Sequence, residues 1–396
     1  MIGAVDDVIY LDNNATTPCD PRVVEAMLPY LTERAANPTS RGHRPGRQAG
    51  EALEGARAAV DRLLGGRAAS EVVFTAGATE ANNLALIGAA ETVASRGRHL
   101  VSQRTEHASV LEPLSVLARR GWRVTLVGVD ADGRIRLDEL AAAVGDDTVL
   151  VSLMLANNET GVVQPVAEAA ELAHGHGALI HCDAAQGVGK VPVDVSVLGV
   201  DLLSLSAHKL YGPKGVGALW RRHRRPPITL APVIFGGGQE GGLRSGTPNL
   251  PGAIGLARAM ELAEEEASSE HDRIAGLRDR LEEAITAGVD GVRINGSHGD
   301  RLPNTSNLAF AGVEANALLA SLPDLAVATG SACTSARPEP SAVLVAMGLP
   351  ADLAAASLRL SLGRFTTAAE VDRAAERIVE EVTRLRALPK RMRRDG

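Results

Sequence analysis

The sequence has 396 residues, of which 45% are hydrophobic and 22% are charged, a composition typical of a globular protein and not of a disordered chain. A formal net charge of −7 and an aromatic content of only 2% argue against direct binding to nucleic acid. Three cysteines are too few and too scattered for a disulfide framework, and no run of 18 apolar residues predicts a membrane segment. The amino-terminal segment also lacks a signal-peptide pattern, so we expect a cytoplasmic protein.

Helical and strand-like patterns alternate from about residue 50, which is typical of a parallel α/β sheet. Short apolar runs predict strands at 71–74, 99–101, 124–127, 149–153, 178–182 and 202–205, and most are followed by a helical segment. A region rich in Pro and Gly at 225–252 predicts a long loop, and a helix is expected at 252–287. The remaining residues mix short strands and helices, which favours a second, smaller domain.

Polar residues follow five of the predicted strands at the points where the strands end. In chain order they are Thr79, His107, Asn158, Asp183 and Lys209. Ligands of open α/β sheets bind beyond the carboxyl ends of the strands, so these side chains are expected to meet in one site.

The residue types at these strand ends suit the chemistry of pyridoxal 5′-phosphate (PLP). A deprotonated Lys209 can react with an aldehyde, and Asp183 can keep a pyridine nitrogen protonated. The segment 77–79 offers backbone N–H groups and a hydroxyl at a helix start, where a phosphate is favoured. His107 is suited to stack on the ring and to move protons near neutral pH. Two further phosphate ligands, Ser206 and His208, lie beside the lysine.

Ten motifs in register then make the sequence resemble one family. They are YLDNNATTP (10–18), NPTSRGHRPG (37–46), FTAGATEANN (74–83), RTEHASVL (104–111), LANNETGVVQPV (155–166), HCDAAQGVGK (181–190), SLSAHKLYGPKGVGAL (204–219), RSGTPN (244–249), TGSACTSARPEPS (329–341) and LRLSLGRFTT (358–367). This set is similar to the group I cysteine desulfurases, the NifS/IscS-like branch of the class V aminotransferase family. The resemblance implies an α/β protein of PLP-dependent transferase fold type I, with a large domain at 16–260 and a smaller α+β domain formed by 1–15 and 261–396.

The resemblance also implies a role for each matching residue. Cys333 is the nucleophile, Lys209 bonds to the cofactor aldehyde, and His107 completes the catalytic residues. The cofactor-binding residues implied are Ala78, Thr79, His107, Asn158, Asp183, Gln186, Ser206, His208, Lys209 and, from the other subunit of a dimer, Thr247. The substrate-binding residues implied are Asn37, Asn158 and Arg359, and no metal site is expected.

The activity implied is conversion of L-cysteine to L-alanine with transfer of sulfur to Cys333 as a persulfide. A homodimer and a sulfur-acceptor protein, such as an iron–sulfur scaffold or a thiolation enzyme, are the implied partners. A selenocysteine lyase or another class V aminotransferase-like enzyme is the alternative within the same fold. A protein whose main task is to relay sulfur to a partner, with little turnover alone, is an alternative of another kind.

Several of these residues also have a plain structural explanation. Thr79 can be a helix cap, His107 a structural histidine, and Arg359 a partner in a structural ion pair. The carboxylate of Asp183, at the end of a buried strand, is expected to need a cationic partner. The G-x-G-x-x-G pattern at 236–241 lies in a loop region without a strand–turn–helix unit, which argues against a nicotinamide site.

Overall fold

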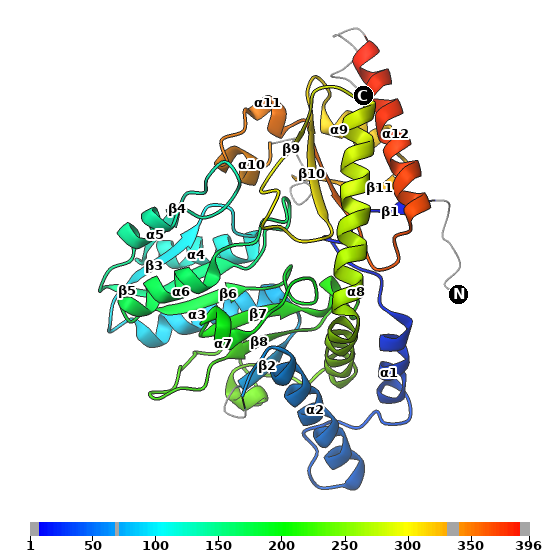
Figure 1. Cartoon of the computed structure of the whole chain (residues 1–396). Coiled ribbons are helices and arrows are strands. Elements are labelled where there is room, and N and C mark those ends of the chain that lie inside the picture. Colours follow the sequence, from blue (N-terminus) through cyan, green and yellow to red (C-terminus); the bar gives the residue numbers. More distant parts are fainter. Residues whose placement is uncertain (1–7, 68–70, 331–339, 389–396) are drawn as a thin grey trace.

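Figure 1 shows the fold in a computed structural model that describes residues 8–67, 71–330 and 340–388. The chain forms a large sheet covered by helices on both faces and a smaller sheet beside it. The described residues do not include Cys333, so the predicted nucleophile lies outside them. Within the described ranges, no helix has the length and apolarity needed to cross a membrane.

The large sheet has seven strands in the order β2-β8-β7-β6-β5-β3-β4. In chain order they are β2 (Glu71–Thr75), β3 (His99–Gln103), β4 (Arg123–Val127), β5 (Thr148–Met154), β6 (Leu179–Asp183), β7 (Leu202–Ser206) and β8 (Gly217–Arg221). Strand β8 runs antiparallel to both of its neighbours, and the other six strands share one direction. The predicted α/β class and its six strands are confirmed, and β8 is an additional strand. All residues of β3, β5, β6 and β7 are buried, as expected for strands covered on both faces.

Helices pack on both faces of this sheet and form two separate apolar cores. The helices α3 (Ala78–Val93) and α4 (Ala108–Arg119) cover one face. The other face is covered by α2 (Arg44–Leu63), α5 (Leu137–Ala143), α6 (Val166–Gly175), α7 (Val195–Leu198) and the first part of α8 (Leu250–Gly288). Both cores consist mainly of Ala, Val and Leu side chains, in keeping with the low aromatic content.

The smaller sheet is antiparallel, with the order β12-β13-β10-β9. Its strands are β9 (Val292–Ile294), β10 (Thr305–Phe310), β12 (Ala328–Thr329) and β13 (Ser357–Ser361). The second part of α8 and the helix α12 (Ala368–Ala387) pack against it through a third apolar core. Three short helices, α9 (Ala315–Ala320), α10 (Ala342–Ala346) and α11 (Ala351–Ala354), complete this region.

Two segments connect the sheets. Helix α8, of 39 residues, contacts α1 (Pro21–Leu31) and α2 at one end and α12 at the other (Figure 1). The predicted domain boundary between residues 260 and 261 falls inside this helix, and the division into 16–260 and the remainder stays a prediction. Near the amino terminus, β1 (Ile9–Tyr10) pairs in parallel with β11 (Leu325–Ala326), and the chain then leads to the end of the large sheet.

Candidate functional site

A cavity of about 910 Å³ opens at the carboxyl ends of the parallel strands. Ten of the thirteen predicted site residues line it: Ala78, Thr79, His107, Asn158, Asp183, Gln186, Ser206, His208, Lys209 and Arg359. Residues from the amino-terminal segment, among them Asp12 and Asn14, and the strand residue Thr329 also line the cavity. The structure therefore brings most of the predicted residues to one place, and the two sheets share the cavity between them.

One part of the cavity is formed by the turn between β2 and α3. Gly77 precedes α3 with a φ of 154°, and a Cβ atom there would lie 3.6 Å from Ser206 Oγ. The turn is therefore open toward Ser206, at the end of β7, whose Oγ is buried and has no hydrogen-bond partner among the described residues. Beside it, burial lowers the pKa of His208 to about 4, and Lys209 adds to this effect. A helix N-terminus, a hydroxyl in need of a partner and a neutral imidazole together suit a phosphate.

His107 lies between β3 and α4 and caps that helix. Its Nδ1 accepts a hydrogen bond of 3.1 Å from the backbone N–H of Ser109, and it lies 2.8 Å from Ser109 Oγ. Burial lowers the pKa of the imidazole; Asp183 acts in the opposite direction, and Lys209 lowers the pKa further. His107 therefore caps α4 through Nδ1 and also lines the cavity, so the structural and the functional interpretations are compatible.

Asp183 is the last residue of β6, and only 6% of its surface is exposed. Its Oδ2 accepts a 2.7 Å hydrogen bond from Asn82 Nδ2, and its Oδ1 accepts one of 3.0 Å from the backbone N–H of Ala185. Both donors are neutral. Close by, burial and the charge of Asp183 raise the pKa of the buried Glu106 well above its usual range, which favours the neutral form of this second carboxyl.

Lys209 ends a short 3₁₀ helix (Ala207–Lys209) directly after β7. Its Nζ donates to the backbone carbonyls of Asn14 and Ala15, the latter at 2.9 Å. The same Asn14 carbonyl accepts a 2.9 Å hydrogen bond from Gln186 Nε2. Gln186 in turn accepts a 2.8 Å hydrogen bond from Lys190 Nζ, and burial together with the charge of Lys209 lowers the pKa of Lys190 well below its usual range. The amino-terminal segment thus holds two of the predicted cofactor-binding side chains.

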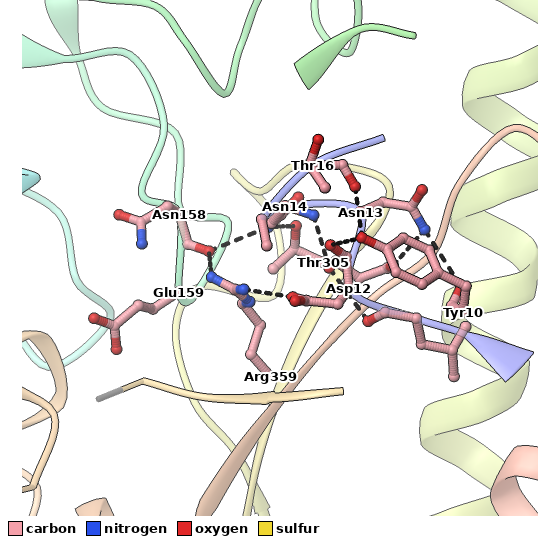
Figure 2. A network of polar contacts seen from close by, with 12 residues as sticks. Tyr10, Asp12, Asn13, Asn14, Thr16, Asn158, Glu159, Thr305 and Arg359 are labelled. Carbon is pink, nitrogen blue, oxygen red and sulfur yellow. Dashed lines mark hydrogen bonds and ion pairs between the residues drawn. The ribbon is translucent and has the colours of Figure 1, made fainter. Parts of the chain in front are cut away.

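Arg359 projects from β13 into the other part of the cavity (Figure 2). Its Nη1 donates to the Asn158 carbonyl at 3.1 Å, and its Nη2 forms an ion pair of 2.6 Å with Asp12 Oδ1. Its Nε is buried without a hydrogen-bond partner in the described part of the chain. A guanidinium has five N–H groups, so donors are left to bind a carboxylate in addition to the ion pair. The structural and the substrate-binding interpretations of Arg359 are compatible.

Glu159 lies behind Arg359 and is buried. Its Oε2 accepts a 2.5 Å hydrogen bond from Ser341 Oγ, and a Cβ atom placed on Gly330 would lie 2.3 Å from the same oxygen. Burial raises the pKa of Glu159 to about 7, against the opposing effects of Ser341 and Arg359. This carboxyl therefore lies beside Gly330 and Ser341, which come shortly before and after the segment 331–339.

Three predicted site residues are not part of this cavity in the described chain. Asn37 is exposed and its Oδ1 accepts hydrogen bonds from Thr39, in a turn before α2. Thr247 is exposed in the loop before α8, and Cys333 lies outside the described residues. Conversely, prediction missed Asn14, Asn82, Ser109, Glu106 and Lys190, all of which lie within the ten quoted motifs.

Comparisons with known proteins identify the family of this chain. The family model for class-V aminotransferases matches residues 9–374. The chain belongs to the class-V aminotransferase family. It is 51% identical over 380 residues to the cysteine desulfurase IscS of Anaeromyxobacter sp. (strain Fw109-5), covering 96% of this chain and 94% of that protein.

Two solved structures extend the likeness to three dimensions. A NifS-like protein superposes with a TM-score of 0.88 at 39% identity, covering 95% of this chain and 99% of that one. A structure described as SspA in complex with cysteine superposes with a TM-score of 0.79 at 34% identity, covering 90% of this chain and 99% of the other. The predicted family and fold are confirmed.

Class-V aminotransferases depend on PLP, and the cavity fits this cofactor. The unpartnered Ser206 Oγ and the open turn at Gly77 form a cradle for its phosphate. The buried Asp183, whose described hydrogen-bond donors are neutral, suits a protonated pyridine nitrogen, which is the cationic partner expected from the sequence. Lys209 lies in the same cavity for the aldehyde.

Proposed function

We propose that this protein is a cysteine desulfurase that converts L-cysteine to L-alanine and takes up the sulfur on Cys333 as a persulfide. The observation that carries the proposal is the single cavity in which Lys209, Asp183 and a phosphate cradle lie opposite Arg359. A PLP enzyme acting on an amino acid needs both halves of this arrangement. The likeness to the IscS protein and to SspA in complex with cysteine supports cysteine as that amino acid.

The residues of the cavity divide the work of binding. The backbone of Ala78 and the side chains of Thr79, Ser206 and His208 would hold the phosphate. Asp183 would hold the ring nitrogen and Gln186 the ring hydroxyl, and His107 would lie against the ring. When bound, PLP supplies an electron sink for the bonds at the α-carbon of the substrate.

Two basic side chains then act on the substrate. Arg359, together with Asn158, would bind the substrate carboxylate, and the ion pair with Asp12 fixes the orientation of the guanidinium. Lys209 would remove the α-proton once its amine is neutral. The Cys333 thiolate would attack the substrate sulfur, so that a sulfur–sulfur bond forms as the carbon–sulfur bond breaks.

The decisive experiment compares the Cys333→Ser and Lys209→Ala variants with the wild type. Cys333→Ser should keep the visible absorbance of bound PLP but produce no sulfide from L-cysteine, and Lys209→Ala should lose both turnover and the normal absorbance. Cys182→Ser, in the buried strand β6, serves as the matched control and should keep activity. Normal sulfide production by Cys333→Ser would refute the assigned nucleophile. Faster alanine release from selenocysteine than from cysteine would favour the lyase alternative.

We also propose a homodimer in which Thr247 of the partner subunit completes each site. Support comes from exposed apolar side chains close in sequence to Asn37 and Thr247, the two described site residues that do not line the cavity. Leu31 at the end of α1 is 58% exposed and precedes Asn37 by six positions, and Phe235 is 80% exposed in the loop that leads to Thr247. Exposed apolar surface of this kind is typical of a subunit interface.

Mixed dimers test this arrangement. Subunits with Lys209→Ala and subunits with Thr247→Ala are each expected to be impaired, but one site of a mixed dimer would contain the wild-type residue at both positions. Unfolding and refolding the two variants together should therefore restore part of the sulfide production, up to about half per mixed dimer. No gain over the separately refolded variants would contradict the shared site.

The sulfur acceptor is proposed to be a protein, either an iron–sulfur scaffold or a thiolation enzyme. Radiolabelled sulfur from L-cysteine should pass from Cys333 to the acceptor and be absent from it when Cys333→Ser is used. A large rise in turnover on adding an acceptor would favour the relay alternative. The cytoplasmic location stays a prediction from the sequence.

A further inference from the structure

The proton on the neutral His107 ring can be placed from its hydrogen bonds. A backbone N–H can only donate, and the N–H of Ser109 lies 3.1 Å from His107 Nδ1. Nδ1 must therefore present its lone pair, and the proton of the neutral ring must be on Nε2. Because Nδ1 faces the start of α4, Nε2 is the ring nitrogen left for the cavity that His107 lines.

Asn82 connects this imidazole to Asp183. Its Nδ2 lies 2.7 Å from Asp183 Oδ2 and 2.9 Å from Ser109 Oγ. A carboxylate only accepts hydrogen bonds, so the amide nitrogen, and not the amide oxygen, must face Asp183. Both N–H groups of Asn82 are then used, one for each partner.

The direction of the remaining hydrogen bond follows. Ser109 Oγ accepts from Asn82, so its own proton is free to point to His107 Nδ1 at 2.8 Å. Two donors from Ser109, the hydroxyl and the backbone N–H, thus converge on one ring nitrogen. Asn82 is fully buried, and Ser109 and Asp183 are only 7% and 6% exposed, so water does not compete well for these bonds.

The polarity of this network is opposite to that of a catalytic triad. In a triad, a carboxylate accepts the Nδ1 proton and makes Nε2 a better base. Here Nδ1 accepts two hydrogen bonds, which stabilises the neutral ring and makes Nε2–H the group presented to a ligand. Of the charged groups near the ring, Asp183 favours protonation and Lys209 opposes it, and burial together with Asp183 raises the pKa of the neighbouring Glu106, which favours its neutral form.

We propose that Ser109 and Asn82 are positioning residues that hold His107 as a neutral imidazole protonated on Nε2. His107 then acts as a hydrogen-bond donor into the cavity and not as the resting base of the site. The inference deepens the proposed function, on which it rests for the identity of the ligand. An Nε2–H donor suits an electron-rich group, and the sulfur of L-cysteine in its thiolate form is such a group.

Nitrogen NMR on the wild-type holoenzyme tests the proton position directly. With histidine labelled by ¹⁵N, the long-range ¹H–¹⁵N pattern distinguishes the two neutral tautomers and the imidazolium, and the signal of His107 is assigned by its loss in His107→Gln. The expected pattern near pH 7 is that of Nε2–H. A pattern of Nδ1–H, or of a doubly protonated ring, would overturn the proposal without any variant of the network.

Two substitutions at one position then test the network. Ser109→Ala removes one donor to Nδ1 and should raise the titration midpoint of His107 by about one pH unit. Ser109→Thr keeps the hydroxyl and should restore the wild-type midpoint. The matched control is Ser115→Ala, which removes an exposed hydroxyl from the same helix and should leave the midpoint unchanged.

The outcomes separate this inference from the proposed function. An unchanged midpoint in Ser109→Ala, or equal midpoints in Ser109→Ala and Ser109→Thr, would contradict the positioning role. An Nε2–H pattern in a protein that releases no sulfide from L-cysteine would count against the proposed function alone. Normal sulfide release with an Nδ1–H pattern would count against this inference alone.

Discussion

The two parts of the cavity are built in different ways. On the side of Asp183, Ser206 and Lys209, the groups stand at the ends of neighbouring strands of one sheet. On the side of Arg359, the contacts join Asp12 and Asn14, Asn158, and Arg359, which come from separate parts of the chain (Figure 2). The first side is set by the topology of a single sheet, and the second depends on how the two sheets are held together.

The two sides also differ in how far their polar groups are satisfied. The first has the buried Ser206 Oγ without a described partner and a carboxylate with neutral donors. On the second side the charge of Arg359 is already paired with Asp12. We therefore expect substitutions on the side of Asp183 and Ser206 to affect the bound cofactor. Substitutions on the side of Arg359 should affect substrate affinity or the stability of the fold.

Asp183→Asn is expected to have the largest effect. An amide cannot stabilise a protonated ring nitrogen as a carboxylate does, so kcat should fall by about 10²- to 10⁴-fold, in the range for loss of a charged catalytic group. Steady-state sulfide production together with the PLP absorbance spectrum measures this. If Asp183→Asn kept the wild-type kcat and absorbance spectrum, the Asp183 side of the cavity would not act on the cofactor as proposed.

Arg359→Lys is expected to act mainly on KM. Lysine keeps the charge but loses the planar fork that binds a carboxylate, so KM for L-cysteine should rise by roughly 10- to 100-fold, with a smaller change in kcat. The control is Arg377→Lys, whose ion pairs with Asp324 and Glu380 lie away from the cavity. An unchanged KM with reduced thermal stability would show that Arg359 has only the structural role.

Glu159→Gln should have the smallest effect on turnover. Its effect is expected instead in how the free energy of unfolding depends on pH. In the unfolded chain this carboxyl loses its proton near pH 4.5, but in the folded chain it keeps the proton up to about pH 7. Its contribution therefore makes the folded state less stable as the pH rises from 4.5 to 7, by on the order of 3 kcal/mol at most.

Urea unfolding at pH 5 and at pH 7.5 measures this contribution. The free energy of unfolding of Glu159→Gln should fall less between the two pH values than that of the wild type. The exposed Glu283→Gln on α8 is the control and should follow the wild type. Parallel pH profiles for Glu159→Gln and the wild type would show that the carboxyl is not held protonated.

The same contrast explains what the sequence could predict. The groups that follow strands were found from the residues alone, because a continuous apolar run marks each strand and the polar residue after it marks the end. Arg359 lies within β13, where nothing local indicates a ligand, and only the resemblance to a family identified it. The antiparallel strand β8 was not predicted; its five residues begin with Gly217, and glycine is depleted in strands.

The proposed positioning residues, Asn82 and Ser109, could not be predicted from the sequence either. Asn82 lies inside α3 and Ser109 inside the first turn of α4, positions at which a polar residue usually has a local explanation. Asn82 bonds to Asp183, which is 101 positions away along the chain, and no sequence pattern connects such distant residues. The structure reveals the pair because α3 and α4 lie side by side on one face of the sheet.

The course of the amino-terminal segment has a consequence for biosynthesis. Asn13 Nδ2 and the backbone N–H of Asn14 bond to Ser361, and the former contact joins residues 348 positions apart. The carbonyl of Asn14, which binds Lys209 and Gln186, is therefore fixed only after β13 has left the ribosome. The large sheet can form during translation, but the cavity gains its final wall only once β13 is available, so a nascent chain that still lacks β13 cannot hold a complete site.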